Sequence, residues 1–248
     1  LNPDRPTVGI TFPRSYWLEH NTAHIEALVT AVEELDANTV PFFCLRLPDA
    51  RRGNPGMAQV LENLLRDDEG RCVVDTLVDV HGMSMTAGVP ANADAYPNLG
   101  VSVLHALTSY APRAAWQATA QGMGSMDVAT QAAQPEFDGA LITKLLATRE
   151  ADEVDDLTGA VVPRMVPVPG RAQAMAELAL SWARLARTPA GQRKVAIVFH
   201  HHPPRNDRIG CASGLDTFES VRQLLIRMAE EGYDVPEQFE TGDDIAQA

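Results

Sequence analysis

Strand-like and helix-like segments alternate along most of this chain, and no other feature of the sequence restricts the fold as strongly. Short apolar runs predict strands over residues 8–12, 39–45, 73–80 and 101–104. Apolar residues at helical spacing predict helices over residues 25–35, capped by Asn21 or Thr22, and over 57–65. This order is typical of a parallel sheet wrapped by helices. We therefore expect an α/β fold with an open, mostly parallel sheet flanked by helices in Rossmann-like layers.

The remaining segments of the first 187 residues carry weaker signals. Residues 90–97 are polar and contain prolines, which predicts a loop. Two later strands are predicted over residues 137–143 and 160–166. The acidic run between them, residues 150–156, predicts a solvated surface loop or a helix end. A strong amphipathic pattern then predicts a helix over residues 171–187.

The end of this helix marks an expected division of the chain. Residues 1–187 are expected to form one α/β domain, and residues 188–193, which contain Pro189 and Gly191, predict a linker. Residues 194–248 then predict a strand-loop-helix unit. This unit either begins a further domain or packs back on the first sheet.

Within this last unit the element boundaries have clear signals. The apolar run 195–199 predicts the strand. Asp216 and Glu219 resemble a capping box at a helix start, and Gly232 lies where the helix is expected to stop. The acidic residues from 234 onward are expected to be frayed.

Composition excludes several classes of protein. With 45% hydrophobic residues among 248, the chain can bury a substantial core. Its net charge of −13 makes it a poor binder of nucleic acid or of anionic membranes, because phosphate contacts need concentrated cations. Cys44, Cys72 and Cys211 are far apart, which fits a reducing compartment and argues against a disulfide frame or a cysteine zinc site. Neither a signal peptide nor a membrane span is visible, so a cytoplasmic location is expected.

Three histidines follow the apolar run at 195–199. Side chains alternate along a strand, so His200 and His202 are expected to point the same way and His201 the other. Two imidazoles on one side can hold a borderline metal such as Co²⁺ or accept a proton near neutral pH. The alternative is that these histidines are polar residues that end a buried strand.

The loop after these histidines is rich in charge and glycine. Arg205, Asp207 and Arg208, beside Gly210, have the chemistry to cradle an anion at the start of the helix near Asp216. No Lys-Ser/Thr pair follows the glycines, so this is not a nucleotide-binding P-loop. An ordinary strand-to-helix turn is the other interpretation.

Other candidate residues lie in the first 187 residues. Glu136 and Asp138 are two apart in a segment expected to be extended, so both carboxylates would face one side and could deliver a cation or take protons. A turn before a strand is the commoner explanation of such a pair. His20 and His24 have helical metal-pair spacing, but the expected helix start between them spoils the geometry. His81 ends the third predicted strand, where a lone histidine is more often structural.

Three blocks of sequence resemble one family. They are TVGITFPRSYWLEHNT at residues 7–22, residues 116–139 with the phrase PEFDG, and residues 203–217 with PPR, IG and GLDT. Their order and spacing resemble the large subunit of ATP-dependent cobaltochelatases of the CobN type, and the related magnesium-chelatase H subunits, over nearly the whole chain. GLDT is more similar to the cobalt branch. His201 and His202 depart from the pattern, since relatives have an amide and then an aromatic residue there.

The resemblance implies a function and a set of partners. Family large subunits hold a tetrapyrrole while Co²⁺ is inserted into a corrin-ring precursor in cobalamin biosynthesis, driven by ATP hydrolysis on separate AAA+ subunits. Co²⁺ would be the substrate metal, and ATP and Mg²⁺ would be used by the partner subunits rather than bound by this chain. Expected partners are a corrinoid or porphyrin-like tetrapyrrole, the AAA+ subunits and the remainder of a parent large subunit.

The family's large subunits are several times longer than this chain, which begins at Leu1. The chain is therefore expected to be a fragment that is inactive by itself. Three alternatives stay open: a non-catalytic docking or scaffold module for AAA+ subunits, a magnesium-chelatase H-type porphyrin-binding subunit, and an unrelated α/β enzyme with an anion-binding loop.

Under the chelatase hypothesis each candidate residue has an expected role. Tetrapyrroles carry carboxylates, which guanidinium groups match in shape and charge, and flat aromatic side chains can lie against the ring. The residues expected to bind substrate are Arg14, Trp17, Arg205, Asp207, Arg208 and Gly210. The residues expected to act in catalysis are His200 and Glu136, and those expected to contact the metal are His200, His202, Glu136 and Asp138. We expect His200, Arg205 and Glu136 to converge on one cleft.

Overall fold

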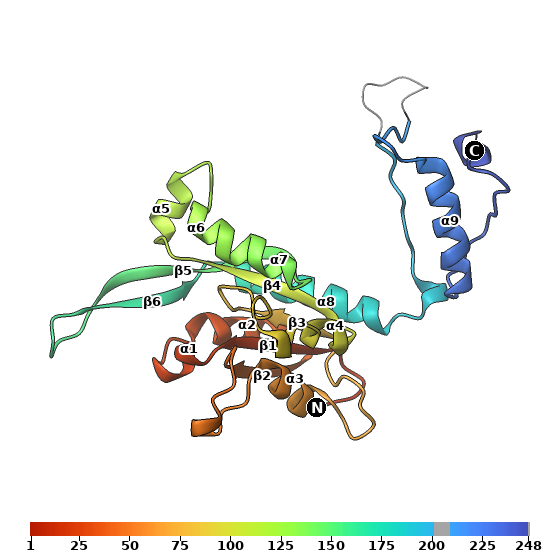
Figure 1. The fold of residues 1–248 in the computed structure, drawn as a ribbon. Helices are drawn as coiled ribbons and strands as arrows, with labels where there is room; N and C mark the ends of the chain where they lie inside the picture. The colour runs from red at the N-terminus through yellow and green to blue at the C-terminus, as the bar shows by residue number, and fades with distance from the viewer. Residues whose placement is uncertain (201–208, 248) are drawn as a thin grey trace. The chain divides into compact units, whose positions relative to one another are not determined.

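The first 187 residues are built on one sheet of six strands (Figure 1). The computed structural model describes residues 1–200 and 209–247, and the chain divides into two compact units, Leu1–Arg187 and Thr188–Ala248. The strand order of the sheet is β2-β1-β3-β4-β5-β6. Strands β1 to β5 run parallel, and β6 pairs antiparallel with β5. The strands are β1 (Thr7–Pro13), β2 (Asn38–Cys44), β3 (Thr76–Asp79), β4 (Ser102–Ser109), β5 (Leu141–Val154) and β6 (Val161–Pro167).

Helices cover both faces of the sheet, which confirms the expected α/β architecture. The longer ones, α2 (Ala23–Glu34) and α8 (Arg171–Arg187), pack together on one face, and α3 (Met57–Leu65) and α4 (Ala95–Leu99) pack on the other. The shorter helical segments are α1 (Arg14–Leu18), η1 (Ala50–Arg52), η2 (Pro90–Asn92), α5 (Arg113–Ala118), α6 (Ser125–Val128), η3 (Ala129–Ala133) and α7 (Gln134–Phe137). Across residues 1–200 and 209–247, no helix is both long and apolar enough to cross a bilayer.

Alternation along the strands sends side chains into two separate cores. Val8, Ile10 and Phe12 of β1 point to the face covered by α2 and α8. Leu77 of β3 and Val103 of β4 point to the face covered by α3 and α4. Each fully buried aliphatic side chain of this kind contributes roughly 1.5–3 kcal/mol to folding. Because both faces are covered, the central strands are mostly apolar, as parallel strands usually are.

Residues 90–97 and 150–156 of the first unit differ from their predicted secondary structure. Residues 90–97 form η2 and the start of α4 rather than a loop, because Pro90 occupies the first turn of η2, where its missing N–H costs nothing. The acidic run at 150–156 is largely strand, because β5 continues to Val154 in a hairpin with β6. This hairpin arm extends away from the rest of the sheet (Figure 1).

The second unit, taken by itself, contains η4 (Ala190–Gln192), α9 (Thr217–Glu230) and α10 (Gly242–Gln247). The predicted cap of α9 is confirmed, because the Asp216 carboxylate accepts a hydrogen bond from the Glu219 N–H at 3.0 Å. Gly232 has the left-handed conformation expected at a helix end, with φ of 82°. Residues 242–247 form a short helix, which corrects the expectation of a frayed end.

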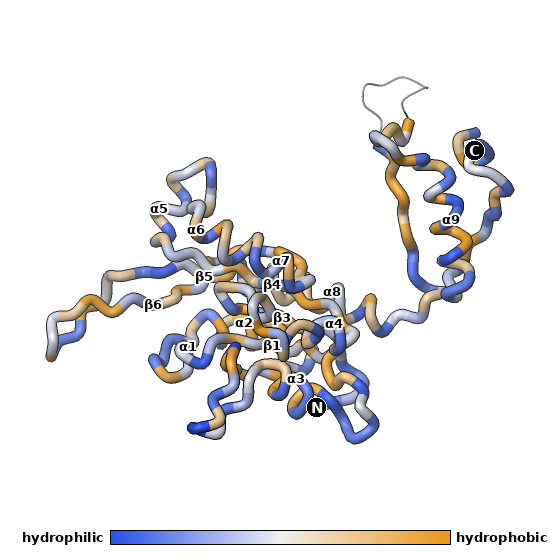
Figure 2. Tube along the Cα trace, in the orientation of Figure 1, coloured by the Kyte–Doolittle hydropathy of each residue, from blue (hydrophilic) through white to orange (hydrophobic). Residues whose placement is uncertain are grey.

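The predicted strand at 195–199 is not formed. The segment is extended and lies along α9, where Phe199 and Phe218 have ring centroids 5.2 Å apart and Val195 and Leu225 line a shared hollow. Figure 2 shows it as a hydrophobic stretch beside α9. A strand needs a neighbour to complete its hydrogen bonds. The described residues of this unit contain no other strand to supply one.

Burial of His24 should make the stability of the folded chain sensitive to acid. Its ring is fully buried in α2, packs edge-to-face on Tyr16 at 4.8 Å, and burial lowers the pKa of His24 to about 4. His24 takes up a proton near pH 6.5 in the unfolded chain but only near pH 4 in the folded chain. The free energy of unfolding therefore falls as the pH drops from 6.5 to 4. This residue alone should account for about 3 kcal/mol of that loss.

We expect His24→Phe to flatten the pH dependence of the unfolding free energy over this window, as measured by urea denaturation at several pH values. The control is His20→Asn, at an exposed position whose φ of 52° suits asparagine, and it should keep the wild-type slope. An equal slope in His24→Phe and wild type would contradict the assignment.

Candidate functional site

Strand order places a topological switch point between β1 and β3. The chain leaves β1 through α2 on one face of the sheet and leaves β2 through α3 on the other face. In open α/β sheets, ligands bind beyond the carboxyl ends of the strands at such a point. The side chains gathered there are polar and buried, and they include Thr11, Cys44, Asp79, His81 and His105. We call these five residues and Tyr96 the switch-point cluster.

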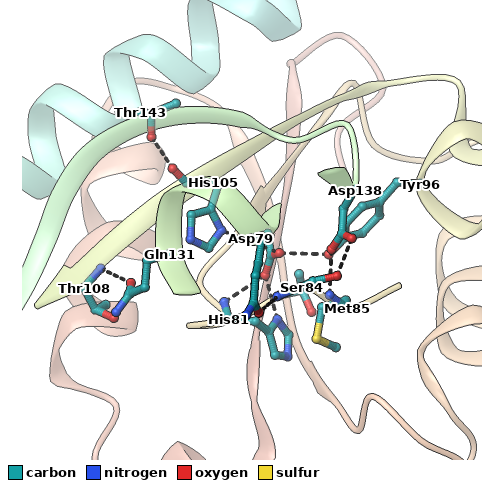
Figure 3. A network of polar contacts seen from close by, with 12 residues as sticks. Asp79, His81, Ser84, Met85, Tyr96, His105, Thr108, Gln131, Asp138 and Thr143 are labelled. Atoms are coloured by element: carbon teal, nitrogen blue, oxygen red, sulfur yellow. Dashed lines mark hydrogen bonds and ion pairs between the residues drawn. The ribbon is translucent and has the colours of Figure 1, made fainter. Parts of the chain in front are cut away.

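Asp79 is the centre of this cluster (Figure 3). It is the last residue of β3, and it is only 1% exposed. One carboxylate oxygen, Oδ1, accepts hydrogen bonds from the backbone N–H and the Nδ1 of His81 at 2.8 and 2.6 Å. The other oxygen, Oδ2, accepts from the Tyr96 hydroxyl at 2.9 Å and lies 3.7 Å from Nδ1 of His105. The carboxylate therefore ties together β3, β4, α4 and the segment after β3.

Strand geometry explains why these residues meet. Residues two apart in an extended segment face the same side, so Asp79 and His81 project together. His105 is the register partner of Asp79 on the neighbouring parallel strand β4, and Thr11 is its partner on β1. Both partners therefore lie beside the carboxylate on the same face.

The pair formed by Asp79 and His81 is charged. Burial opposes charge on both groups, but their mutual attraction and hydrogen bond outweigh it. As a result the pKa of Asp79 is held well below its usual range, and the pKa of His81 is raised to about 10. Burial, with the nearby Asp79 charge, raises the pKa of Tyr96 well above 10, so its hydroxyl remains a donor. Near neutral pH His81 can therefore donate hydrogen bonds, but it cannot serve as a general base.

A loop over residues 82–88 packs against the cluster through Met85 and is held by Asp138. The Asp138 carboxylate accepts hydrogen bonds from the Ser84 hydroxyl at 2.5 Å, the Met85 N–H at 2.6 Å and the Thr86 hydroxyl at 2.5 Å. Figure 3 shows Asp138 beside Tyr96, Ser84 and Met85. Asn92 adds a further tie, since its side-chain amide donates to the Met85 carbonyl at 2.9 Å.

A second buried polar side chain, that of Gln131, lies at the end of β4. The Gln131 side-chain oxygen accepts from the N–H and the hydroxyl of Thr108 at 2.7 and 2.9 Å. Its amide nitrogen is buried without a hydrogen-bond partner, as are both ring nitrogens of His105. Gly82 passes close by, and a Cβ at this position would lie 3.3 Å from the Tyr110 hydroxyl. Only glycine fits this approach without a shift of its neighbours.

The predicted residues Arg14 and Trp17 lie in α1, directly after β1. Trp17 is 57% exposed and stacks on Phe43, with ring centroids 6.1 Å apart and planes 26° apart. Trp17 also borders a groove of about 430 Å³, lined with it by Phe12, Thr22, Ile25, Glu26, Val29, Thr30 and Pro41. Arg14 is half-buried, and among the described residues no carboxylate forms an ion pair with it. An exposed aromatic pair beside a groove is a suitable surface for a flat ligand.

The expected geometry of Glu136 and Asp138 is wrong. The segment is helical rather than extended, because α7 runs from Gln134 to Phe137 with Pro135 in its first turn and Asp138 at its end. Glu136 is exposed, whereas Asp138 is buried and occupied by three hydrogen bonds. The two carboxylates therefore do not form a pair on one side, and Asp138 holds the loop at 82–88.

The remaining predicted residues belong to the second unit. His200 is exposed, and its carbonyl accepts a hydrogen bond from the Gly210 N–H at 2.7 Å. Gly210 has a φ of 66°, and a Cβ there would lie 3.1 Å from Phe199 and Thr217, so glycine is required for close packing. His202, Arg205, Asp207 and Arg208 lie outside the described residues. Their roles, and the predicted convergence of His200, Arg205 and Glu136, remain predictions.

Most of the switch-point cluster is not predicted by the sequence patterns. They mark His81 only as a strand end, and they do not single out the neighbouring Asp79. The usable signal is the Asp-x-His spacing at the end of an apolar run, which puts both side chains on one face. His105 and Tyr96 have no local signal. In the part of the chain that the structure describes, no group of three or more His, Cys, Asp and Glu residues is arranged to hold a metal ion.

Comparison with known proteins gives one consistent result. The family model described as CobN/Magnesium Chelatase matches residues 1–248. The aerobic cobaltochelatase subunit CobN of Sinorhizobium sp is 30% identical over 239 residues, which cover 96% of this chain and 18% of that protein. The magnesium-chelatase H subunit of Rhodobacter capsulatus is 28% identical over 98% of this chain and 20% of its own length.

One solved structure is also similar. The catalytic subunit of cobaltochelatase from Mycobacterium tuberculosis superimposes with a TM-score of 0.74 at 29% identity, over 98% of this chain and 19% of that protein. The chain thus spans about a fifth of the length of these relatives.

Replacing one carboxylate oxygen of Asp138 tests whether this residue holds the loop at 82–88. Asp138→Asn replaces an acceptor with an amide N–H that faces buried donors, which should cost about 1–3 kcal/mol of unfolding free energy. Hydrogen exchange at the Met85 N–H should accelerate in the same variant. Glu136→Gln, two residues away and exposed, is the matched control and should change stability by no more than about 0.5 kcal/mol. Equal effects of the two substitutions would contradict the anchoring role.

The buried ion pair between Asp79 and His81 should make the folded chain less stable at alkaline pH. The folded-state pKa of His81, about 10, exceeds its ordinary value of 6.5, so the stabilisation is complete below pH 6.5 and is lost as pH rises toward 10. We expect the melting temperature to fall more steeply between pH 7 and 10 in wild type than in the double variant Asp79→Asn/His81→Gln. Parallel curves would show that the pair is not charged in the folded chain.

Proposed function

The chain belongs to the CobN/magnesium chelatase family, and from this premise we propose that it is part of the tetrapyrrole-holding large subunit of a metal chelatase. The observation that carries the proposal is the family match along all 248 residues. It is supported by the similarity to a solved catalytic subunit of cobaltochelatase over 98% of this chain. The reaction proposed for the whole assembly is insertion of Co²⁺ into a corrin-ring precursor, with ATP hydrolysis on separate AAA+ subunits.

Metal insertion makes three chemical demands. The metal must lose water, the ring must bend to expose its nitrogens, and two N–H protons must leave. In the proposed division of labour this chain contributes to holding and bending the ring. Trp17 and Phe43 offer a flat apolar surface, and Arg14 lies in the same short helix to pair with a ring carboxylate. His200, Glu136, Arg205 and Arg208 retain their proposed roles in proton, metal and substrate handling.

A cobalt substrate is favoured by the CobN relatives and by GLDT at residues 214–217. A magnesium-chelatase H-type porphyrin-binding role is the second candidate, favoured by the 28% identity to a magnesium-chelatase H subunit over 98% of this chain. Both candidates place a flat, carboxylate-bearing macrocycle on the same surface. They differ in which macrocycle binds more tightly.

A docking role for AAA+ subunits is favoured by a different observation. The hairpin arm of β5 and β6 ends in exposed apolar side chains, with Leu157 96% exposed and Val154 and Val161 more than half exposed. Exposed apolar groups at the end of an arm are typical of protein contacts. A docking module would capture the ATPase subunits without binding a tetrapyrrole.

Ligand titration tests the proposal. We expect a metal-free corrinoid, and more weakly a metal-free porphyrin, to quench tryptophan fluorescence and to shift the absorption band of the macrocycle. Trp17→Leu and Arg14→Ala should each weaken binding about tenfold, which corresponds to the loss of one stacking or charge-assisted contact. Arg51→Ala, which removes an exposed arginine of η1, is the control and should bind as wild type does.

Equal affinity in Trp17→Leu, Arg14→Ala and wild type would remove these two residues from the proposed site. Tighter binding of the porphyrin than of the corrinoid would favour the magnesium-type role. No binding of either macrocycle, together with capture of the ATPase subunits through Leu157, would favour the docking role.

A further inference from the structure

The side chains of Cys44, His81 and Asp79 in the switch-point cluster form a row of thiol, imidazole and carboxylate. Sγ of Cys44, the last residue of β2, lies 3.8 Å from Nε2 of His81. The opposite ring nitrogen of His81, Nδ1, lies 2.6 Å from Oδ1 of Asp79. A nucleophile within reach of an imidazole that is itself oriented by a carboxylate is the arrangement that activates cysteine in many unrelated folds.

The surroundings of this row separate it from an ordinary buried thiol. The hydroxyl of Thr11 lies 3.6 Å from the Cys44 sulfur. On the other side of Asp79, His105 is fully buried and faces the carboxylate at 3.7 Å, while neither of its ring nitrogens has a hydrogen-bond partner. Buried polar groups are nearly always hydrogen-bonded, so the His105 ring, which meets Asp79 at 3.7 Å without a hydrogen bond, adds an unusual polar group to the surroundings of this row.

We propose that Cys44 is a nucleophilic thiol, activated by His81 and Asp79, and that it undergoes thiol–disulfide exchange with small disulfides. In this step the Cys44 sulfur attacks one sulfur of the disulfide R–S–S–R, an S–S bond forms, and the original S–S bond breaks. The departing sulfur takes up a proton, which replaces the one that Cys44 has lost, and leaves as the thiol R–SH. No further oxidant is needed, because the small disulfide is the co-reactant. The inference does not depend on tetrapyrrole binding.

Charge on His81 supports the assignment. Burial opposes it, but Asp79 and then Cys44 act to raise the pKa of His81 to about 10. The ring therefore carries a proton over the physiological range and presents Nε2–H to the sulfur. A cation beside a sulfur stabilises the thiolate, which is the reactive form.

The thiol is reached only when its surroundings open, since Cys44 is 4% exposed and His81 5% exposed. The loop at 82–88 packs in the same cluster as Cys44 through Met85 and is anchored by Asp138. We infer that movement of this loop admits the disulfide. Asp138→Asn, which removes one acceptor of the anchor, should expose the thiol without touching the row itself.

The chain carries its own reference thiols. Cys72 is half-buried, and burial raises the pKa of the Cys72 thiol, so it should react slowly. Cys211 is exposed in the second unit. Mass spectrometry of peptides resolves the mixed disulfide formed at each cysteine, so all rates come from one sample.

The experiment measures the rate of reaction with dithiodipyridine at pH 7 at the three cysteines. In Asp138→Asn, we expect the Cys44 rate to rise about tenfold over wild type because the anchor of the loop is weakened, while the Cys72 and Cys211 rates change by no more than about twofold. In Asp138→Asn/His81→Gln, the Cys44 rate should fall at least about tenfold below its value in Asp138→Asn, again with little change at Cys72 and Cys211. In the wild-type chain Cys44 should react slowly but measurably, and this measurement needs no folded variant.

Two results would overturn the proposal. The first is a Cys44 rate in Asp138→Asn that the further substitution His81→Gln leaves unchanged. The second is a Cys44 that stays unmodified in Asp138→Asn while the urea-unfolded chain reacts fully, since the thiol would then be an inert core residue.

Discussion

The buried ion pair between Asp79 and His81 is the interaction on which the functional end of this sheet depends. A carboxylate that is 1% exposed cannot remain charged without partners, because an unpaired buried charge costs several kcal/mol. Its partners come from the segment after β3, from α4 and from β4. The contacts of this one carboxylate therefore fix the relative positions of α4, β4 and the segment after β3.

Two surfaces of different character meet at the carboxyl ends of β1 to β3. On the face of α2 lies the aromatic pair of Trp17 and Phe43, beside an apolar groove. On the face of α3 lies the switch-point cluster, which is polar, charged and buried. Alternation along single strands produces this division, since Phe43 and Cys44 are neighbours in β2 and point to opposite faces. One strand end therefore offers a surface for a flat apolar ligand on one side and polar chemistry on the other.

Local patterns predict the parallel sheet and its long helices correctly, because hydrophobic periodicity is a property of short segments. They fail where distant residues decide the structure. The acidic residues near 150 form strand because β6 supplies hydrogen bonds from across the hairpin. Residues 195–199 have no such neighbour among the residues that the structure describes. The pairing of Asp79 with His105 is a relation of register between two strands, and no spacing in the sequence reveals it. Asp138 is singled out by its sequence context as a cation ligand, whereas the structure makes it an anchor.

The hairpin arm has a consequence for protein engineering. Its described outer side chains belong to neither of the two cores, so lengthening it, shortening it or altering its charges should scarcely disturb the folded domain. A foreign peptide or a reporter group inserted in the turn of this arm would therefore leave the interior of the domain unchanged.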